Sequence, residues 1–303
     1  MHYYQLYGLI IASQIELPYA KTILKVDEDI SIILTPDLEV SLENTKDING
    51  FKLDEHGSVY FDSGHGWLYI EEGKTIKLKL ENKADTQAIT QYIMGSAMAV
   101  ILQQRKTLLL HASAVSKDGR AMIITGPSGL GKSSTAALLN DAGYDLISDD
   151  MAAIRFQGDQ AWIMSGPSIQ KIGTDVLRHL NEPIDEKVKT LADGKPKYFR
   201  PFTASEKMMP ISHIYCLART DSTHSDLFTG PELKQFYSVY RNSFRFRLIG
   251  PLGFAKRHME QCTDLYKMVT TKTLALPNDY LDFDNTVSLL DRDFSQSQDF
   301  YMK

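Results

Sequence analysis

The sequence predicts an α/β protein in which a β-rich N-terminal domain is followed by a domain built around a phosphate-binding loop. Up to about residue 82, short segments alternate polar and apolar side chains with period two, which is typical of half-buried strands. Farther along, an apolar strand runs into the glycine-rich segment 126–133, which leads into a helix and then a strand at 145–148. Because 303 residues suffice for two domains, we place them at 1–105 and 106–303.

The N-terminal domain should end in a helix over Asp85–Arg105. Asp85 is a suitable N-cap, and apolar residues recur behind it at three- and four-residue spacing. The domain has no segment with the spacing of a catalytic site, so we interpret it as a sheet platform or as a substrate-recognition module. Its clearest expected strands and turns are Ile30–Leu34, 54–57 (turn), Gly57–Ile70, 71–73 (turn) and Thr75–Leu80.

The second domain should begin with a strand that ends at His111 and continue with a hairpin that turns at Asp118-Gly119. A helix from Lys132 to about Asp141 follows, with Gly143 as its stop. The remaining expected elements are a strand over 145–148, a hairpin over 151–164, a helix over 174–180, a strand over 213–217 and a helix over 232–240.

Composition excludes several protein classes. Hydrophobic residues make up 43% of the chain and charged residues 23%, which is ordinary for a globular protein. The net charge of -5 argues against an extended nucleic-acid surface. Two cysteines are too few for a disulfide framework, and the longest apolar stretch, Ile93–Leu102, is too short for a membrane span. We therefore expect a cytoplasmic protein that binds neither nucleic acid nor a membrane.

The motif G-x-x-x-x-G-K-[ST] carries the predicted chemistry. It occupies Gly126-Pro127-Ser128-Gly129-Leu130-Gly131-Lys132-Ser133, and Ser134 follows. The glycines let the backbone N–H groups approach phosphates, and the helix that opens at the loop adds positive potential there. Lys132 is expected to reach the β- and γ-phosphates, and the Ser133 hydroxyl to bind Mg²⁺. The nine residues from Gly126 to Ser134 are thus the expected ATP-binding segment.

Three further residues complete a candidate catalytic group. Asp149 and Asp150 end a strand that we expect beside the phosphate-loop strand, so that one carboxylate could bind Mg²⁺ and the other accept a proton. The alternative is a solvated turn or a helix cap. His111 ends an apolar strand, and it is either a buried core histidine or a group near the γ-phosphate.

The stretch from His111 to Asp150 resembles the catalytic domain of HPr kinase/phosphorylase, a bacterial serine kinase. The resemblance implies an HPr-kinase-like fold in which His111, Lys132 and Asp150 are catalytic, Asp150 being the base. It also implies a metal site at Ser133 and Asp149. Two features differ: Ser134 stands where bifunctional members carry an acidic residue, and the second signature Leu-Glu-x-Arg-Gly-Leu-Gly is absent.

A branch of this family that accompanies lasso-peptide biosynthesis is more similar. It shares chain length, Tyr7-Gly-Leu-Ile-Ile-Ala-Ser13, Leu109-Leu-His-Ala-Ser-Ala-Val115, and a proline and lysine after the acidic pair, here Pro167 and Lys171. The resemblance implies an ATP- and Mg²⁺-dependent kinase of a precursor-peptide serine. An HPr-type regulatory kinase/phosphorylase and a non-catalytic ATP-binding, peptide-docking module are the alternatives, and an oligomer is compatible with all three.

A basic and aromatic segment, Tyr240–Arg247, could supply a further cation to the phosphates or to an acidic peptide terminus. We rank Arg245 first as a catalytic cation. The alternative is a strand or helix with a solvated basic face. The other candidate cations are Lys171, Lys197, Arg200, Arg241 and Arg247.

Overall fold

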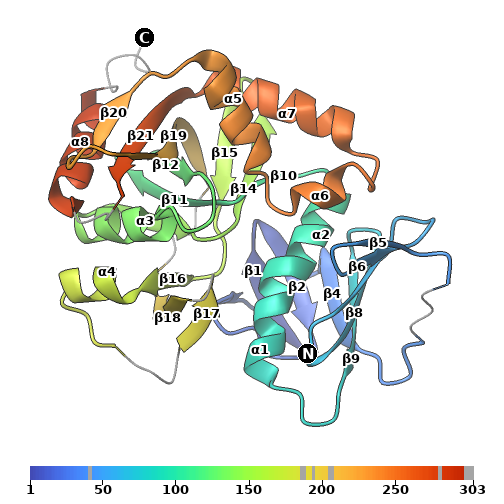
Figure 1. Ribbon diagram of the computed structural model, residues 1–303. Helices are drawn as coiled ribbons and strands as arrows, with labels where there is room; N and C mark the ends of the chain where they lie inside the picture. The colour runs from blue at the N-terminus through green and yellow to red at the C-terminus, as the bar shows by residue number, and fades with distance from the viewer. Residues whose placement is uncertain (40–42, 185–188, 193–194, 204–207, 279–281, 297–303) are drawn as a thin grey trace. The chain divides into compact units, whose positions relative to one another are not determined.

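The computed structural model describes residues 1–39, 43–184, 189–192, 195–203, 208–278 and 282–296 (Figure 1). The chain forms two compact units. Unit 1 comprises Met1–Leu109 and Ser243–Gln261, and unit 2 comprises Leu110–Asn242 and Cys262–Lys303. This division differs from the predicted boundary at 105/106, because Ser243–Gln261 returns to the N-terminal unit. Long-range hydrogen bonds hold this segment there: Phe244 N–H donates to Leu109 O, and the Gln103 amide donates to Phe244 O.

Unit 1 contains a nine-stranded sheet with the order β3-β1-β2-β4-β9-β8-β7-β6-β5. The period-two pattern predicts its burial well, since Leu68, Ile70, Ile76 and Leu78 point to one face and are buried. The strands are β1 (His2–Leu6), β2 (Leu9–Ser13), β3 (Lys21–Thr22), β4 (Ile30–Leu34), β5 (Lys46–Ile48), β6 (Phe51–Leu53), β7 (Val59–Asp62), β8 (Gly66–Glu71) and β9 (Thr75–Leu80).

The helix predicted over Asp85–Arg105 forms in three parts. These are α1 (Thr86–Tyr92), the π-helical turn η1 (Ile93–Ala97) and α2 (Met98–Gln104), which contacts β8. Asp85 caps α1 as predicted, because its carboxylate accepts the N–H groups of Gln87 and Ala88. Periodicity did not reveal the π turn. Unit 1 also holds α6 (Phe246–Ile249), and α7 (Ala255–Met268) begins in it.

Unit 2 is built on a mixed sheet with the order β14-β15-β19-β12-β11-β13, in which β21 pairs with β19 and β20 with β21. Strands β12, β19 and β21 are parallel. The strand bounds are β10 (Leu108–Leu110, across the unit boundary), β11 (Ala112–Lys117), β12 (Arg120–Thr125), β13 (Asp145–Ser148), β14 (Ala152–Gln157), β15 (Gln160–Met164), β19 (Met209–Thr220), β20 (Asp226–Phe228) and β21 (Thr270–Pro277).

Helices α3 (Lys132–Asp141) and α8 (Phe283–Gln296) pack on this sheet around a core that includes Ile124, Leu139 and Phe294. Helix α5 (Glu232–Arg241) packs on β19 and β21. A small sheet, β16-β18-β17, lies beside α3 together with α4 (Thr174–His179). Its strands are β16 (Ile169–Gly173), β17 (Lys189–Ala192) and β18 (Lys195–Pro201). Within the described ranges, no helix is long and apolar enough to span a bilayer.

Most local predictions in unit 2 are confirmed, and one topological prediction is wrong. Asp118 and Gly119 both have positive φ (52° and 73°), as a two-residue hairpin turn requires, and α3 has its predicted bounds. The strand that carries the acidic pair, β13, does not lie beside the phosphate-loop strand β12. It pairs with β11, which the hairpin places between them. Strand β19 is longer than the predicted 213–217.

Candidate active site

The phosphate loop connects β12 to α3, as its motif predicts. Gly126, Gly129 and Gly131 all have positive φ, at 147°, 79° and 106°, and Gly131 is the N-cap of α3. A Cβ on Gly126 would lie 3.1 Å from Leu217 Cβ and 3.2 Å from Leu217 O on the neighbouring strand β19. The glycines therefore let the loop turn against the sheet while the first N–H groups of α3 face outward from its start.

Lys132 places its charge inside this loop. Its side chain is buried, and Nζ donates to the carbonyls of Gly126 (2.9 Å) and Pro127 (3.1 Å). The following residue, Ser133, lies between two groups: its carbonyl accepts the Gln170 amide at 2.9 Å, and its hydroxyl is near enough to Asp149 to lower the pKa of that carboxyl. The start of α3 is thus fixed to both β16 and the acidic pair.

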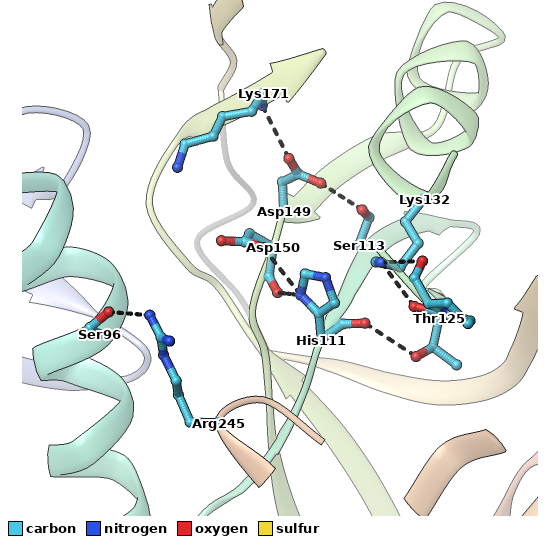
Figure 2. A network of polar contacts seen from close by, with 11 residues as sticks. Ser96, His111, Ser113, Thr125, Lys132, Asp149, Asp150, Lys171 and Arg245 are labelled. Carbon is cyan, nitrogen blue, oxygen red and sulfur yellow. Dashed lines mark hydrogen bonds and ion pairs between the residues drawn. The ribbon is translucent and has the colours of Figure 1, made fainter. Parts of the chain in front are cut away.

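Asp149 is buried and joins four chain segments. Its Oδ1 accepts the Ser113 hydroxyl of β11 at 2.5 Å, and its Oδ2 accepts the Lys171 N–H of β16 at 3.1 Å (Figure 2). Burial raises the pKa of Asp149, and the charge of Asp150 adds to the rise, whereas hydrogen bonds from Ser113, the Lys171 N–H and Ser133 oppose it. The Asp149 carboxylate therefore lies near the Ser133 hydroxyl, and the Ser113 hydroxyl and the Lys171 N–H donate to its two oxygens.

Asp150 has a different environment from its neighbour. Its φ is 69°, in the left-handed region, and its side chain is 49% exposed. His111 Nδ1 lies 3.2 Å from Asp150 Oδ1 and 3.0 Å from Asp150 O (Figure 2). Because both atoms that Nδ1 contacts are hydrogen-bond acceptors, Nδ1 carries a proton.

The electrostatics of Asp150 favour the ionised form. Partial burial would raise its pKa, but the hydrogen bond and charge of His111 outweigh burial, and the pKa is lowered below 3.8. The charges of Lys171 and Lys132 act in the same direction. One carboxylate is thus buried with a raised pKa and the other is accessible with a lowered one, a separation that suits two different roles.

Backbone contacts fix the orientation of His111. Its N–H donates to Asn242 O at the end of α5 (2.6 Å), and its carbonyl accepts the Thr125 hydroxyl at the end of β12 (3.2 Å). The structure therefore brings together His111, the phosphate loop and the acidic pair, although they follow three different strands, β10, β12 and β13. Sequence reasoning missed the supporting residues Ser113, Gln170 and Asn242, for which no motif gives a signal.

The predicted cations do not form one group. In unit 2, Arg200 donates to Glu182 (2.8 Å), Asn140 (3.0 Å) and Gln170 (3.5 Å), so its link to the start of α3 runs through Gln170. Lys171 lies over the Phe199 ring at 5.7 Å. Arg245 belongs to unit 1, where it donates to the Ser96 hydroxyl of η1 at 2.5 Å. It is not part of the network within unit 2, and its catalytic role stays a prediction.

The remaining cations of the basic segment are also divided between the units. Arg247 donates to Asn49 in unit 1 (2.8 Å), whereas Arg241 lies over the Tyr237 ring in unit 2 at 5.8 Å. The segment Tyr240–Arg247 therefore does not act as a single clamp within either unit.

Comparisons with known proteins agree on one family name. No protein-family model matches the chain. It is 30% identical over 124 residues to HPr kinase/phosphorylase of Exiguobacterium sp., and the alignment covers 38% of each protein. It is 33% identical over 117 residues to HPr kinase/phosphorylase of Clostridium botulinum, which covers 39% of this chain and 34% of the relative. Part of this chain is homologous to the HPr kinase/phosphorylases.

The homology covers little more than a third of these HPr kinase/phosphorylases. Among solved structures, the Hpr(Ser) kinase/phosphatase from Coxiella burnetii is similar at a TM-score of 0.30 and 12% identity. That match covers 62% of this chain and 98% of the other.

Proposed function

We propose that unit 2 is an ATP- and Mg²⁺-dependent kinase that transfers the γ-phosphate to a serine hydroxyl of a peptide. The observation that carries this proposal is the pairing of Asp150 with His111 in one network with the phosphate loop. A module that only binds nucleotide has no use for an accessible, ionised carboxylate at this position. Phosphoryl transfer to a hydroxyl needs such a group to accept the proton.

The residues at the start of α3 fit the nucleotide and its metal. The positive-φ glycines and Lys132 form a cationic cradle of the kind that binds phosphates. The Ser133 hydroxyl and the Asp149 carboxylate are hard oxygen donors, which Mg²⁺ prefers, and the hydroxyl is near enough to the carboxyl to lower its pKa. When bound, Mg²⁺ would neutralise charge on the phosphates.

The chain's own groups then have separate tasks. Lys132 and the loop orient the γ-phosphate. The serine oxygen bonds to the γ-phosphorus while the bond from that phosphorus to the bridging oxygen breaks and ADP leaves, and Asp150 takes the proton of the serine hydroxyl. His111 Nδ1–H holds Asp150 in place through two hydrogen-bond contacts. Such an ATP-dependent reaction belongs in the cytoplasm, where the nucleotide is abundant.

For the acceptor, we propose a lasso-type precursor peptide, on the resemblance at Tyr7–Ser13 and Leu109–Val115. A regulatory protein kinase/phosphorylase of the HPr type is the second candidate, because the relatives carry that name. The missing second signature and Ser134 favour the first.

The experiment incubates the purified chain with Mg²⁺ and γ-labelled ATP, and with either a synthetic precursor peptide or HPr. Labelled peptide supports the first acceptor and labelled HPr the second. ATP binding without label in either acceptor would contradict both kinase functions. It would favour the non-catalytic ATP-binding, peptide-docking module instead.

A further inference from the structure

Helix α5 of unit 2 carries a row of exposed side chains that the proposed chemistry does not use. Leu233 is 79% exposed and Tyr237 is 57% exposed. They lie one helical turn apart, and Arg241 follows one turn later on the same face. The opposite face holds the buried residues Gln235 and Val239. We call Leu233, Tyr237 and Arg241 the α5 row.

The α5 row ends at the candidate active site. Directly after Arg241, the Asn242 carbonyl accepts the His111 N–H at 2.6 Å, so the C-terminal end of α5 is fixed to the histidine that holds Asp150. Before the helix, Phe228 is 44% exposed and lies near Gly230. The row therefore forms a partly apolar track, and its Arg241 end is the end of α5 that contacts His111 through the next residue, Asn242.

The charge along the track indicates what binds there. Arg241 stands at the end near the site, with its guanidinium over the Tyr237 ring at 5.8 Å. Exposed Glu232 and exposed Lys234 adjoin Leu233 and balance each other, so the positive charge of the row comes from Arg241. A basic group beside exposed leucine and tyrosine side chains complements a segment that carries one acidic and one apolar side chain.

We propose that the α5 row docks the acceptor peptide of the kinase, by binding an apolar side chain at Leu233 and Tyr237 and an acidic side chain at Arg241. The proposal rests on the kinase activity proposed above. From Leu233 to Asn242 the helix rises roughly 13 Å, at about 1.5 Å per residue. An extended peptide covers that length in about four residues. The apolar residue should thus lie about five residues from the serine, and the acidic residue between them.

The test uses synthetic peptides with one serine in a Gly-Gln background. Two carry an aspartate two residues and a leucine five residues from the serine, on its N-terminal or its C-terminal side, and a third carries neither. The wild-type chain should phosphorylate one of the two Leu/Asp peptides with about tenfold higher kcat/KM than the plain peptide, equivalent to about 1.4 kcal/mol.

Variants then locate the effect. Leu233→Ser combined with Tyr237→Ser should raise KM for that peptide about tenfold, with kcat and KM for ATP within about twofold of the wild type. The matched control is Leu24→Ser, at a leucine in unit 1 that is 90% exposed, and it should change nothing. Arg241→Glu should favour a peptide with lysine in place of the aspartate.

Several outcomes overturn the proposal. Equal kcat/KM for all three peptides, or an unchanged KM in the double variant, shows that the α5 row does not bind the acceptor. If the double variant changes the oligomeric state by light scattering and leaves the kinetics unchanged, the row is an interface between two copies of the chain. If the wild type phosphorylates no peptide and no protein acceptor, the proposed function fails and the docking proposal fails with it.

Discussion

Replacing Asp150 by Asn should separate activity from stability. The Asp150–His111 pair has a separation of 3.2 Å, but the carboxylate is 49% exposed, and pairs that water reaches contribute about 0–1 kcal/mol. Asparagine also tolerates the positive φ of 69° at this position, so the backbone gains no strain. We therefore expect the free energy of unfolding to fall by less than about 1 kcal/mol.

The rate should fall much more. A positioned base commonly contributes about 10²–10⁴-fold, which corresponds to roughly 2.7–5.4 kcal/mol in the barrier. Asparagine keeps one acceptor oxygen but cannot take the proton. In Asp150→Asn, kcat for phosphoryl transfer should thus drop at least about 100-fold, while the affinity for a fluorescent ATP analogue with Mg²⁺ stays within about twofold.

The assay pairs single-turnover phosphoryl transfer with urea unfolding, and the chain offers a matched control. Asp118→Asn makes the same change at a residue that also has positive φ (52°), in the turn at the far end of β11. It should match the wild type in both measurements. The reasoning is refuted if Asp150→Asn keeps more than about a tenth of kcat, since the proton acceptor is then another group.

Three further predictions follow from single residues. Asp149→Asn should lower Mg²⁺–ATP affinity and rate together, as calorimetry and kinetics would show; loss of rate alone contradicts the metal role. Gly126→Ala should weaken nucleotide binding, since the new Cβ would lie 3.1 Å from Leu217 Cβ at a φ of 147°, and unchanged affinity contradicts this. Burial lowers the pKa of His213 to about 4, so its contribution is complete above pH 6.5 and lost as the pH falls toward 4. Between pH 7 and 5 the free energy of unfolding should fall by about 2 kcal/mol in the wild type, and His213→Phe should remove that part of the slope.

Local features of the fold could be predicted from the sequence because short segments determine them. The Asp118-Gly119 turn, the bounds of α3 and the Asp85 cap each depend on residues within a few positions of one another. The same holds for the phosphate loop, whose glycines and lysine are consecutive in the motif.

Features that depend on distant pairing could not be predicted. The position of β11 between β12 and β13 follows from strand pairing, and no periodicity encodes it. Likewise, the hydrogen bond from the Gln103 amide to Phe244 O joins residues far apart in the chain. It helps to hold the segment Ser243–Gln261, which contains Arg245, in unit 1. Support of Asp149 by the Ser113 hydroxyl depends on this same topology.

The most direct test of the proposed function is the mass of a serine peptide after incubation with the chain, ATP and Mg²⁺. We predict that the wild type adds the mass of one phosphate group to the peptide and releases ADP in equal amount. Lys132→Ala, which removes the ammonium group from the loop, should add none while its circular dichroism spectrum stays that of the wild type. An unmodified peptide with the wild type, or equal modification by Lys132→Ala, would contradict the proposed phosphoryl transfer at this loop.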